Sequence, residues 1–259
     1  ALQAMAMSGW EAGDMLDAME GIFNLAAASG ADLAQTSDIV ADVLSDFGMK
    51  AGEAGHFADV LAAASSQSGT NVALLTETFQ TVGAMAGMLG YSMEDVALAA
   101  GLMAGAQSSG ARSGAALNAI FTRLSTNVDG AADALNGLGI AYFKADGSAR
   151  GFGNMIQELR TATAGYTQEQ KANLANTIAG ADAQKEFLAI LDATAEDYEN
   201  LSSAVNHADC AAGEAAESMM DNLDGSITLL QGAVDEVKLS FGEWIAPYVR
   251  GVAEWLTDA

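Results

Sequence analysis

The sequence reads "SDFGMKAGEAGHFADVLAAA" from Ser45 to Ala64 and "GMLGYSMEDVALAAGLMAGA" from Gly87 to Ala106, two stretches of similar character. Gly48 of the first stretch aligns with Gly90 of the second, 42 positions later. In both, apolar residues recur at helical spacing, and the glycine can end one helix in the left-handed conformation before the next begins. The pattern therefore predicts a repeated helix–turn–helix.

The composition extends this prediction to the whole chain. Of 259 residues, 51% are apolar but only 7% are aromatic, because alanine and 12 methionines, with 28 glycines beside them, are so frequent. Alanine is the best helix former and methionine fills irregular gaps between helices. Pro247 is the only proline, and helix interiors exclude proline. We expect an all-α protein whose helical repeat units span residues 32–68 and 74–110.

Local signals place the individual helices. Capping boxes at Ser92 and Thr167 open two of them, and Phe187, Leu188 and Leu191 mark another. Helical spacing predicts further helices over about 10–28, 32–46, 52–65, 72–90, 112–127 and 154–164. The stretch at 139–152, "GIAYFKADGSARGF", contains an Asp-Gly pair between two β-prone runs and predicts a small hairpin.

The last part of the chain carries a heptad pattern. Apolar residues follow each other in alternating steps of three and four, at Met220, Leu223, Ile227, Leu230, Val234, Val237, Phe241, Trp244 and Tyr248. This predicts a long C-terminal helix over 196–259, kinked near Pro247, after a compact helical core over 1–195. The pattern fits self-association of two chains in a coiled coil, and it equally fits a helix that packs on its own domain.

The net charge of −24 limits the partners. Up to Ala111 the only base is Lys50, against 13 acids. Such a chain repels phosphates, so we expect no direct binding of nucleic acid and no electrostatic attraction to anionic lipids. The charge-free runs at 60–76 and 78–93 are shorter than the roughly 20 residues of a spanning helix, so no ordinary transmembrane helix is predicted. The start at Ala1, without a basic segment or a methionine, predicts no signal peptide and suggests a piece of a longer chain.

The residue types that carry chemistry are scattered. His207 and Cys210 are spaced for one helical face, but no second ligand cluster completes a metal site, and His56 stands alone. Arg112 precedes a helix and could hold an anion, although its Gly/Ser-rich surroundings better fit a connection between closely packed helices. The acidic groups follow no calcium-loop pattern and are Glu94/Asp95, Glu196/Asp197/Glu199, Asp221/Asp224 and Asp235/Glu236. We predict no catalytic, cofactor-binding or metal-binding residue, and no enzyme.

The order of these motifs resembles a known family. Residues 8–66 begin "SGWEAGDMLDAMEGIFNLAAASG", residues 89–124 read "LGYSMEDVALAAGLMAGAQSSGARSGAALNAIFTRL", and residues 167–191 read "TQEQKANLANTIAGADAQKEFLAIL". Together with the hairpin and the closing "Ile-Ala-Pro" at 245–247, they are similar to the core region of tail tape measure proteins of long-tailed bacteriophages and prophages. The serines of "QSSGARSG" depart from the apolar or basic residues more frequent there.

The resemblance implies a structural role without catalytic residues. Members of this family lie in the lumen of the tail tube in the virion, set tail length during assembly in the bacterial cytoplasm, and leave the tail before the DNA. It implies as partners the tail tube protein, the tail-tip or distal tail proteins and the tail assembly chaperones. It also implies a role in genome delivery across the host envelope. An alternative function is a membrane-active helical module that forms a conduit, motivated by helices rich in Met, Ala and Gly whose apolar runs are just below spanning length.

Overall fold

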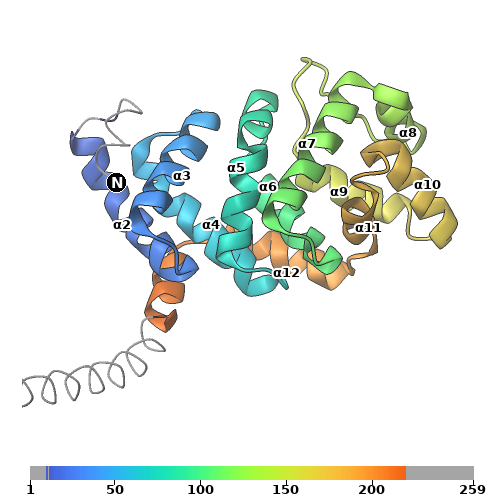
Figure 1. Cartoon of the computed structure of the whole chain (residues 1–259). Coiled ribbons are helices and arrows are strands. Elements are labelled where there is room, and N and C mark those ends of the chain that lie inside the picture. The colour runs from blue at the N-terminus through green and yellow to red at the C-terminus, as the bar shows by residue number, and fades with distance from the viewer. Residues whose placement is uncertain (1–9, 11, 220–259) are drawn as a thin grey trace, which may run out of the picture. The chain divides into compact units, whose positions relative to one another are not determined.

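The structure, a computed structural model, describes residue 10 and residues 12–219 (Figure 1). This part of the chain is all-α, as predicted. Its helices are α2 (Ala12–Ser29), α3 (Leu33–Asp46), α4 (Ala54–Gln67), α5 (Val72–Leu89), α6 (Met93–Leu102), α7 (Gly110–Thr126), α8 (Ala131–Gly137), α9 (Phe152–Ala162), α10 (Gln168–Ala179), α11 (Gln184–Asp192) and α12 (Ala195–Asn206). Short 3-10 helices are η1 (Ala51–Glu53), η2 (Met103–Ala106) and η3 (Val128–Gly130), and a further helical segment covers 211–219.

Four helices end in the same kind of glycine turn. Gly30, Gly48, Gly90 and Gly139 all have φ between 65° and 80°, which only glycine adopts without strain. The residue after each glycine donates its N–H to a carbonyl five positions earlier. The bonds are Ala31 to Ala26, Met49 to Leu44, Tyr91 to Ala86 and Ile140 to Leu135. These are Schellman turns, and the pair at Gly48 and Gly90 has the 42-residue offset seen in the sequence.

Side-chain caps begin many of the helices. The Ser92 hydroxyl accepts from the Asp95 N–H at 3.1 Å, and Thr167 and Gln170 form a reciprocal capping box, so both predicted helix starts are confirmed. Asp32, Asn71, Ser109 and Thr194 cap other helices in the same way. Each cap satisfies backbone N–H groups that the first helical turn leaves free.

Glycines let the helices approach until their backbones touch. A Cβ atom on Gly87 of α5 would lie 2.7 Å from the carbonyl carbon of Asp46 in α3, and nearer still to its oxygen. A Cβ on Gly21 of α2 would lie 2.5 Å from the Ala54 carbonyl carbon, and one on Gly114 of α7 would lie 2.8 Å from the Thr78 carbonyl oxygen of α5. The glycine-rich sequence that opens α7 therefore serves close packing of α7 on α5, as predicted.

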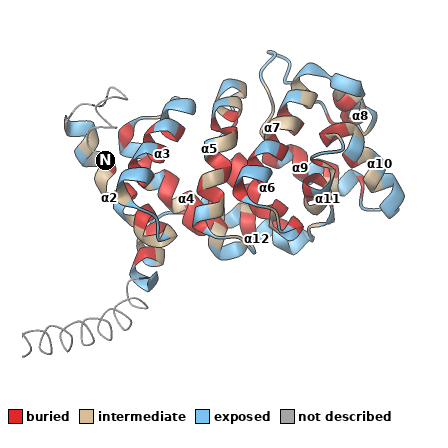
Figure 2. Ribbon diagram, in the orientation of Figure 1, coloured by how far each residue is buried: buried red, intermediate tan, exposed pale blue. Residues whose placement is uncertain are grey.

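The core fills the spaces between these helices, and Figure 2 shows the buried residues on the inward sides of the ribbon. Two aromatic groups anchor it. Phe79 of α5 packs edge-on against Phe57 of α4 at a centroid distance of 5.2 Å. Phe121 of α7 lies 4.5 Å from Tyr91 and 4.9 Å from Phe152 at the start of α9. Aromatic pairs at these distances add specific geometry to area burial.

The predicted hairpin at 139–152 is reduced to one antiparallel bridge, between Phe143 and Ala149. Gly147 has φ of 85° and closes a turn in which its N–H donates to the Lys144 carbonyl, so the Asp-Gly turn is present. No strand extends from it, because its flank is held by the helical core. Tyr142 is buried, and its hydroxyl oxygen accepts a hydrogen bond from the Tyr91 hydroxyl at 2.7 Å.

The compact unit extends to Ala216. The boundary predicted after residue 195 falls just after the first residue of α12, a helix that packs against α4 and α6 of the compact unit. The chain turns at 207–210 between α12 and the 211–219 segment, so the helix predicted from 196 does not run unbroken. The heptad residues and Pro247 lie outside the described residues.

Candidate functional site

His56 is part of a link between two helices. Its Nε2 atom lies 2.6 Å from Oε1 of Glu94, so the histidine of α4 is tied to the start of α6. Burial raises the pKa of Glu94, but hydrogen bonds from its own backbone N–H and from His56 outweigh burial and lower it overall. A carboxylate held this way joins α4 to α6. The pair gives His56 a structural contact.

Asp95 joins three helices. Its Oδ1 atom accepts a hydrogen bond of 2.7 Å from the Gly153 N–H, so a side chain of α6 caps α9. The Gly153 carbonyl accepts in turn from the Tyr198 hydroxyl of α12, at 3.0 Å. Burial raises the pKa of Asp95, and the hydrogen bonds from Gly153 and Phe152 only partly offset it. The arrangement fixes the crossing of α6, α9 and α12.

Arg112 is bound to a carboxylate of its own chain. Its Nε donates to Oε1 of Glu186 at 2.7 Å, and one terminal nitrogen donates to the Asp182 carbonyl at 2.8 Å. The Ser108 hydroxyl donates to the same Glu186 oxygen at 2.6 Å. Glu186 is fully buried; burial raises its pKa, but the bonds from Ser108 and Arg112 outweigh burial and lower it. The guanidinium that could have held an external anion is thus paired with a buried carboxylate of its own chain.

The remaining candidates from the sequence are dispersed. Nδ1 of His207 lies 2.9 Å from the Ser203 carbonyl oxygen, whereas Cys210 is exposed and donates its backbone N–H to Asp59. Asp197 accepts from Thr194 as a helix cap. Among the residues the structure describes, no three His, Cys, Asp or Glu side chains converge on a metal position. Asp221, Asp224, Asp235 and Glu236 lie outside the described residues.

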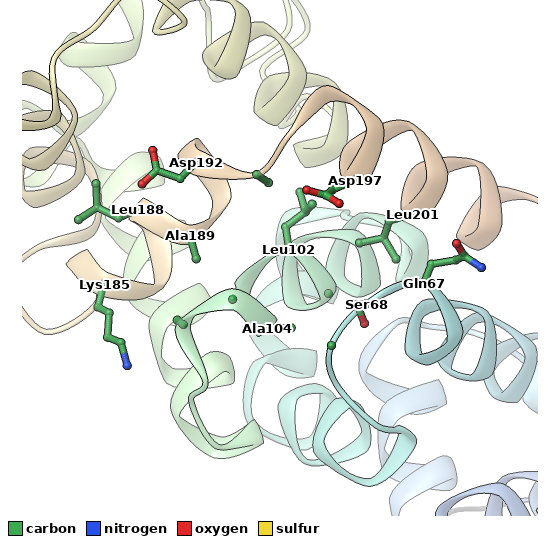
Figure 3. Close-up of a pocket in the computed structure, with 15 residues that line it drawn as sticks. Gln67, Ser68, Leu102, Ala104, Lys185, Leu188, Ala189, Asp192, Asp197 and Leu201 are labelled. Atoms are coloured by element: carbon green, nitrogen blue, oxygen red, sulfur yellow. The ribbon is translucent and has the colours of Figure 1, made fainter.

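A first cleft among the described residues has a volume of about 470 Å³ (Figure 3). It lies where the end of α6 and η2 face α11 and α12, with the end of α4 beside them. Its surface combines leucines and alanines with a few polar groups. The side chains labelled in Figure 3 are Gln67, Ser68, Leu102, Ala104, Lys185, Leu188, Ala189, Asp192, Asp197 and Leu201. No sequence pattern predicted this cleft.

A second cleft, of about 480 Å³, adjoins the first at Asp192 and Ala193. Its two cations are held by groups of the same chain. The Arg160 guanidinium lies 5.3 Å from the Tyr198 ring centroid and donates to the Ala193 carbonyl, while Lys171 pairs with Asp192 at 2.6 Å. Burial lowers the pKa of Arg160, and the nearby hydroxyl and carboxylates oppose this. The cations of this cleft are therefore used for internal contacts.

One described helix, α5, is long and apolar enough to cross a membrane, judged by length and hydropathy alone. The prediction from charge-free runs missed it because those runs end at Glu77, the charged residue within α5. Core helices of soluble proteins pass the same test. In this structure Leu75, Phe79 and Val82 of α5 are buried in the core.

The architecture defines a helical module assembled by close backbone packing, and the sequence comparisons say which class of protein it is. The chain belongs to the phage-related minor tail protein family, whose model matches residues 1–180. The chain is 32% identical over 256 residues to the tape measure protein of Pneumococcus phage Dp-1, covering 99% of this chain and 22% of that protein. It is 23% identical over 239 residues to the probable tape measure protein of Escherichia phage P2, covering 88% of this chain and 29% of that protein.

These relatives confirm the resemblance to tape measure proteins seen in the sequence. The chain spans less than a third of the length of either of them. No solved structure matches this chain.

Proposed function

We propose that this chain is a folded helical module within a phage tail tape measure protein, and that it serves tail-length determination and tail assembly. The observation that carries the proposal is the similarity to the Dp-1 tape measure protein along 99% of the chain. The described structure agrees with a structural role, since the candidate acids and bases cap helices or pair with other groups of the chain. The thiol of Cys210 is exposed and lies apart from them. We propose no catalytic step.

The proposal includes a location and partners. The module would lie in the lumen of the tail tube in the virion and in the bacterial cytoplasm during assembly. It would contact the tail tube protein, the tail-tip or distal tail proteins and the assembly chaperones, and it would associate with a second copy through the heptad residues Leu223, Ile227, Leu230, Val234, Val237, Phe241 and Trp244. On infection it would leave the tail and aid genome passage through the host envelope. A net charge of −24 suits a protein that must not retain DNA.

Tail length tests the ruler role. In-frame deletions within the helical rod of the full-length protein should shorten tails by about 1.5 Å per residue removed, because an α-helix rises by that amount. The measurement is tail length in electron micrographs of virions that carry each deletion. A matched control deletes the same number of residues from another tail protein whose loss still permits assembly. Tails of unchanged length in the rod deletions would refute the ruler role.

A membrane-active module is the second candidate, because α5 is long and apolar enough to span a bilayer. In that case the chain should release dye from vesicles of phosphatidylethanolamine and phosphatidylglycerol at neutral or acidic pH. Met88→Glu is a suitable variant, since Met88 is 80% exposed and its replacement leaves the core intact. Release that the variant abolishes supports the membrane function. No release at either pH leaves the structural function alone.

A further inference from the structure

The first cleft, shown in Figure 3, has an apolar floor. Leu102 of α6 and Leu201 of α12 are buried at its base, and Leu188 and Ala189 of α11 are half-buried along its wall. Gly105 of η2 is exposed there, and a Cβ on it would meet only the Ala189 methyl group, at 4.0 Å. A volume of about 470 Å³ is in the range of sites that hold a ligand group of several heavy atoms.

Lys185 and Asp197 place opposite charges at two points on the rim. Lys185 makes no ion pair or hydrogen bond within the described residues, although the chain has 34 acids and only 10 bases. On α12, Asp197 uses Oδ2 to cap its own helix. Figure 3 shows Lys185 and Asp197 well apart, with Ala189 and Leu102 between them. The cleft thus presents a positive group at one end, an apolar surface in the middle and a negative group at the other end.

The wall formed by the end of α4 adds backbone groups. Gly69 lines the cleft, is exposed, and forms no hydrogen bond with the described residues. Ser68 before it has extended backbone, with φ of −123° and ψ of 165°. The free N–H and C=O groups of Gly69, next to this one extended residue, can pair with the backbone of a bound polypeptide. This favours a polypeptide over a compact small molecule.

We propose that the cleft binds an extended polypeptide segment of a partner protein, with an apolar side chain on the floor between an acidic and a basic residue. The acidic residue pairs with Lys185, the basic residue with Asp197, and the backbone with Gly69. The inference rests on the proposed function in one respect, because a protein that serves assembly must hold other tail proteins. The charges of Lys185 and Asp197 and the apolar floor determine which side chains such a segment must have.

A peptide library tests the proposal on the 259-residue chain. Random dodecapeptides displayed on mRNA are selected on the immobilised protein, and enriched peptides are measured by fluorescence anisotropy. We expect enriched sequences with an apolar residue flanked by one acid and one base. Gly105→Leu should lower the affinity for these peptides by about tenfold or more, because the leucine side chain occupies the apolar floor. Gly52→Leu is the matched control, since a Cβ at Gly52 meets nothing within 4 Å.

Charge reversal makes the test sharper. Lys185→Glu should lower the affinity for the enriched peptides by about fivefold. In a new selection, this variant should enrich peptides in which a basic residue replaces the acidic one. Lys144→Glu, the same change at an exposed lysine in the hairpin turn, should leave affinity and selection unchanged. The proposal is overturned if the native protein enriches peptides no better than the Gly105→Leu protein does. It is also overturned if the Lys185→Glu protein selects the same peptides as the native protein. Because no virion is involved, these outcomes are independent of the tail-length result.

Discussion

Replacing Gly87 with alanine tests whether backbone contact between helices holds this module together. The new Cβ would lie 2.7 Å from the Asp46 carbonyl carbon and 3.2 Å from Phe47 Cα, and neither backbone atom can rotate away. The helices α3 and α5 must therefore separate, and overpacking of this kind costs about 1–3 kcal/mol or more. Alanine recovers at most about 1 kcal/mol through its better helix propensity. We expect a net loss of about 1–2 kcal/mol.

Urea unfolding followed by circular dichroism measures this loss, and a thermal scan should show a midpoint lowered by about 2–8 °C for a domain of this size. Gly55→Ala is the matched control, because Gly55 lies in α4 and a Cβ there meets nothing within 4 Å. The control should be neutral or stabilised by about 0.5–1 kcal/mol. If Gly87→Ala were as stable as Gly55→Ala, close packing through glycine would not be what holds α3 against α5.

Three further predictions concern buried Glu186, half-buried Asp95 and the contact of Asp59 with the last described helical segment. The folded-state pKa of Glu186 lies below its unfolded value, so its charge stabilises the fold above about pH 4.3 and that stabilisation is lost as pH falls. Glu186→Gln should therefore flatten the decline in unfolding free energy from about pH 5 to 3, and an unchanged slope contradicts this. The pKa of Asp95 is raised instead, so its charge is disfavoured in the fold at neutral pH and stability is regained as pH falls through the folded pKa. Asp95→Asn should keep the Gly153 cap and the stability, whereas Asp95→Ala should lose about 1 kcal/mol in urea unfolding; equal losses refute the cap. Asp59→Ala should speed hydrogen exchange at the amide of Cys210 about fivefold, with Asp59→Asn closer to the native protein, and equal protection in all three contradicts the contact.

Much of the fold could be predicted because its signals are local. Gly48 and Gly90 end helices through bonds to residues within the preceding turn and a half, and Ser92 caps a helix that begins at the next residue. All the residues that make up such a signal are neighbours in the sequence. The hairpin was overestimated for the opposite reason, because whether strands extend from the Asp-Gly turn depends on how the core holds Tyr142.

The contacts between distant segments could not be predicted. Asp95 and Gly153 are 58 positions apart, and Arg112 and Glu186 are 74 apart. The sequence does not distinguish a carboxylate that caps a helix from one that belongs to a surface cluster. The two differ only in whether folding brings a backbone N–H group beside them. The cleft could not be predicted either, because its lining comes from five helical elements, α4, α6, η2, α11 and α12.

The Schellman turns and the Asp59 cap have a consequence for the order in which the chain acquires its structure. Each glycine turn closes over six residues, so the hairpins of α2–α3, α3–α4 and α5–α6 can form as soon as their own residues leave the ribosome. The Asp59 carboxylate, however, receives the N–H groups of Cys210 and Ala212, about 150 positions further along. That bond must come late in synthesis, which makes the exposed thiol of Cys210, the chain's single cysteine, a natural attachment point for a dye that reports when the module is complete.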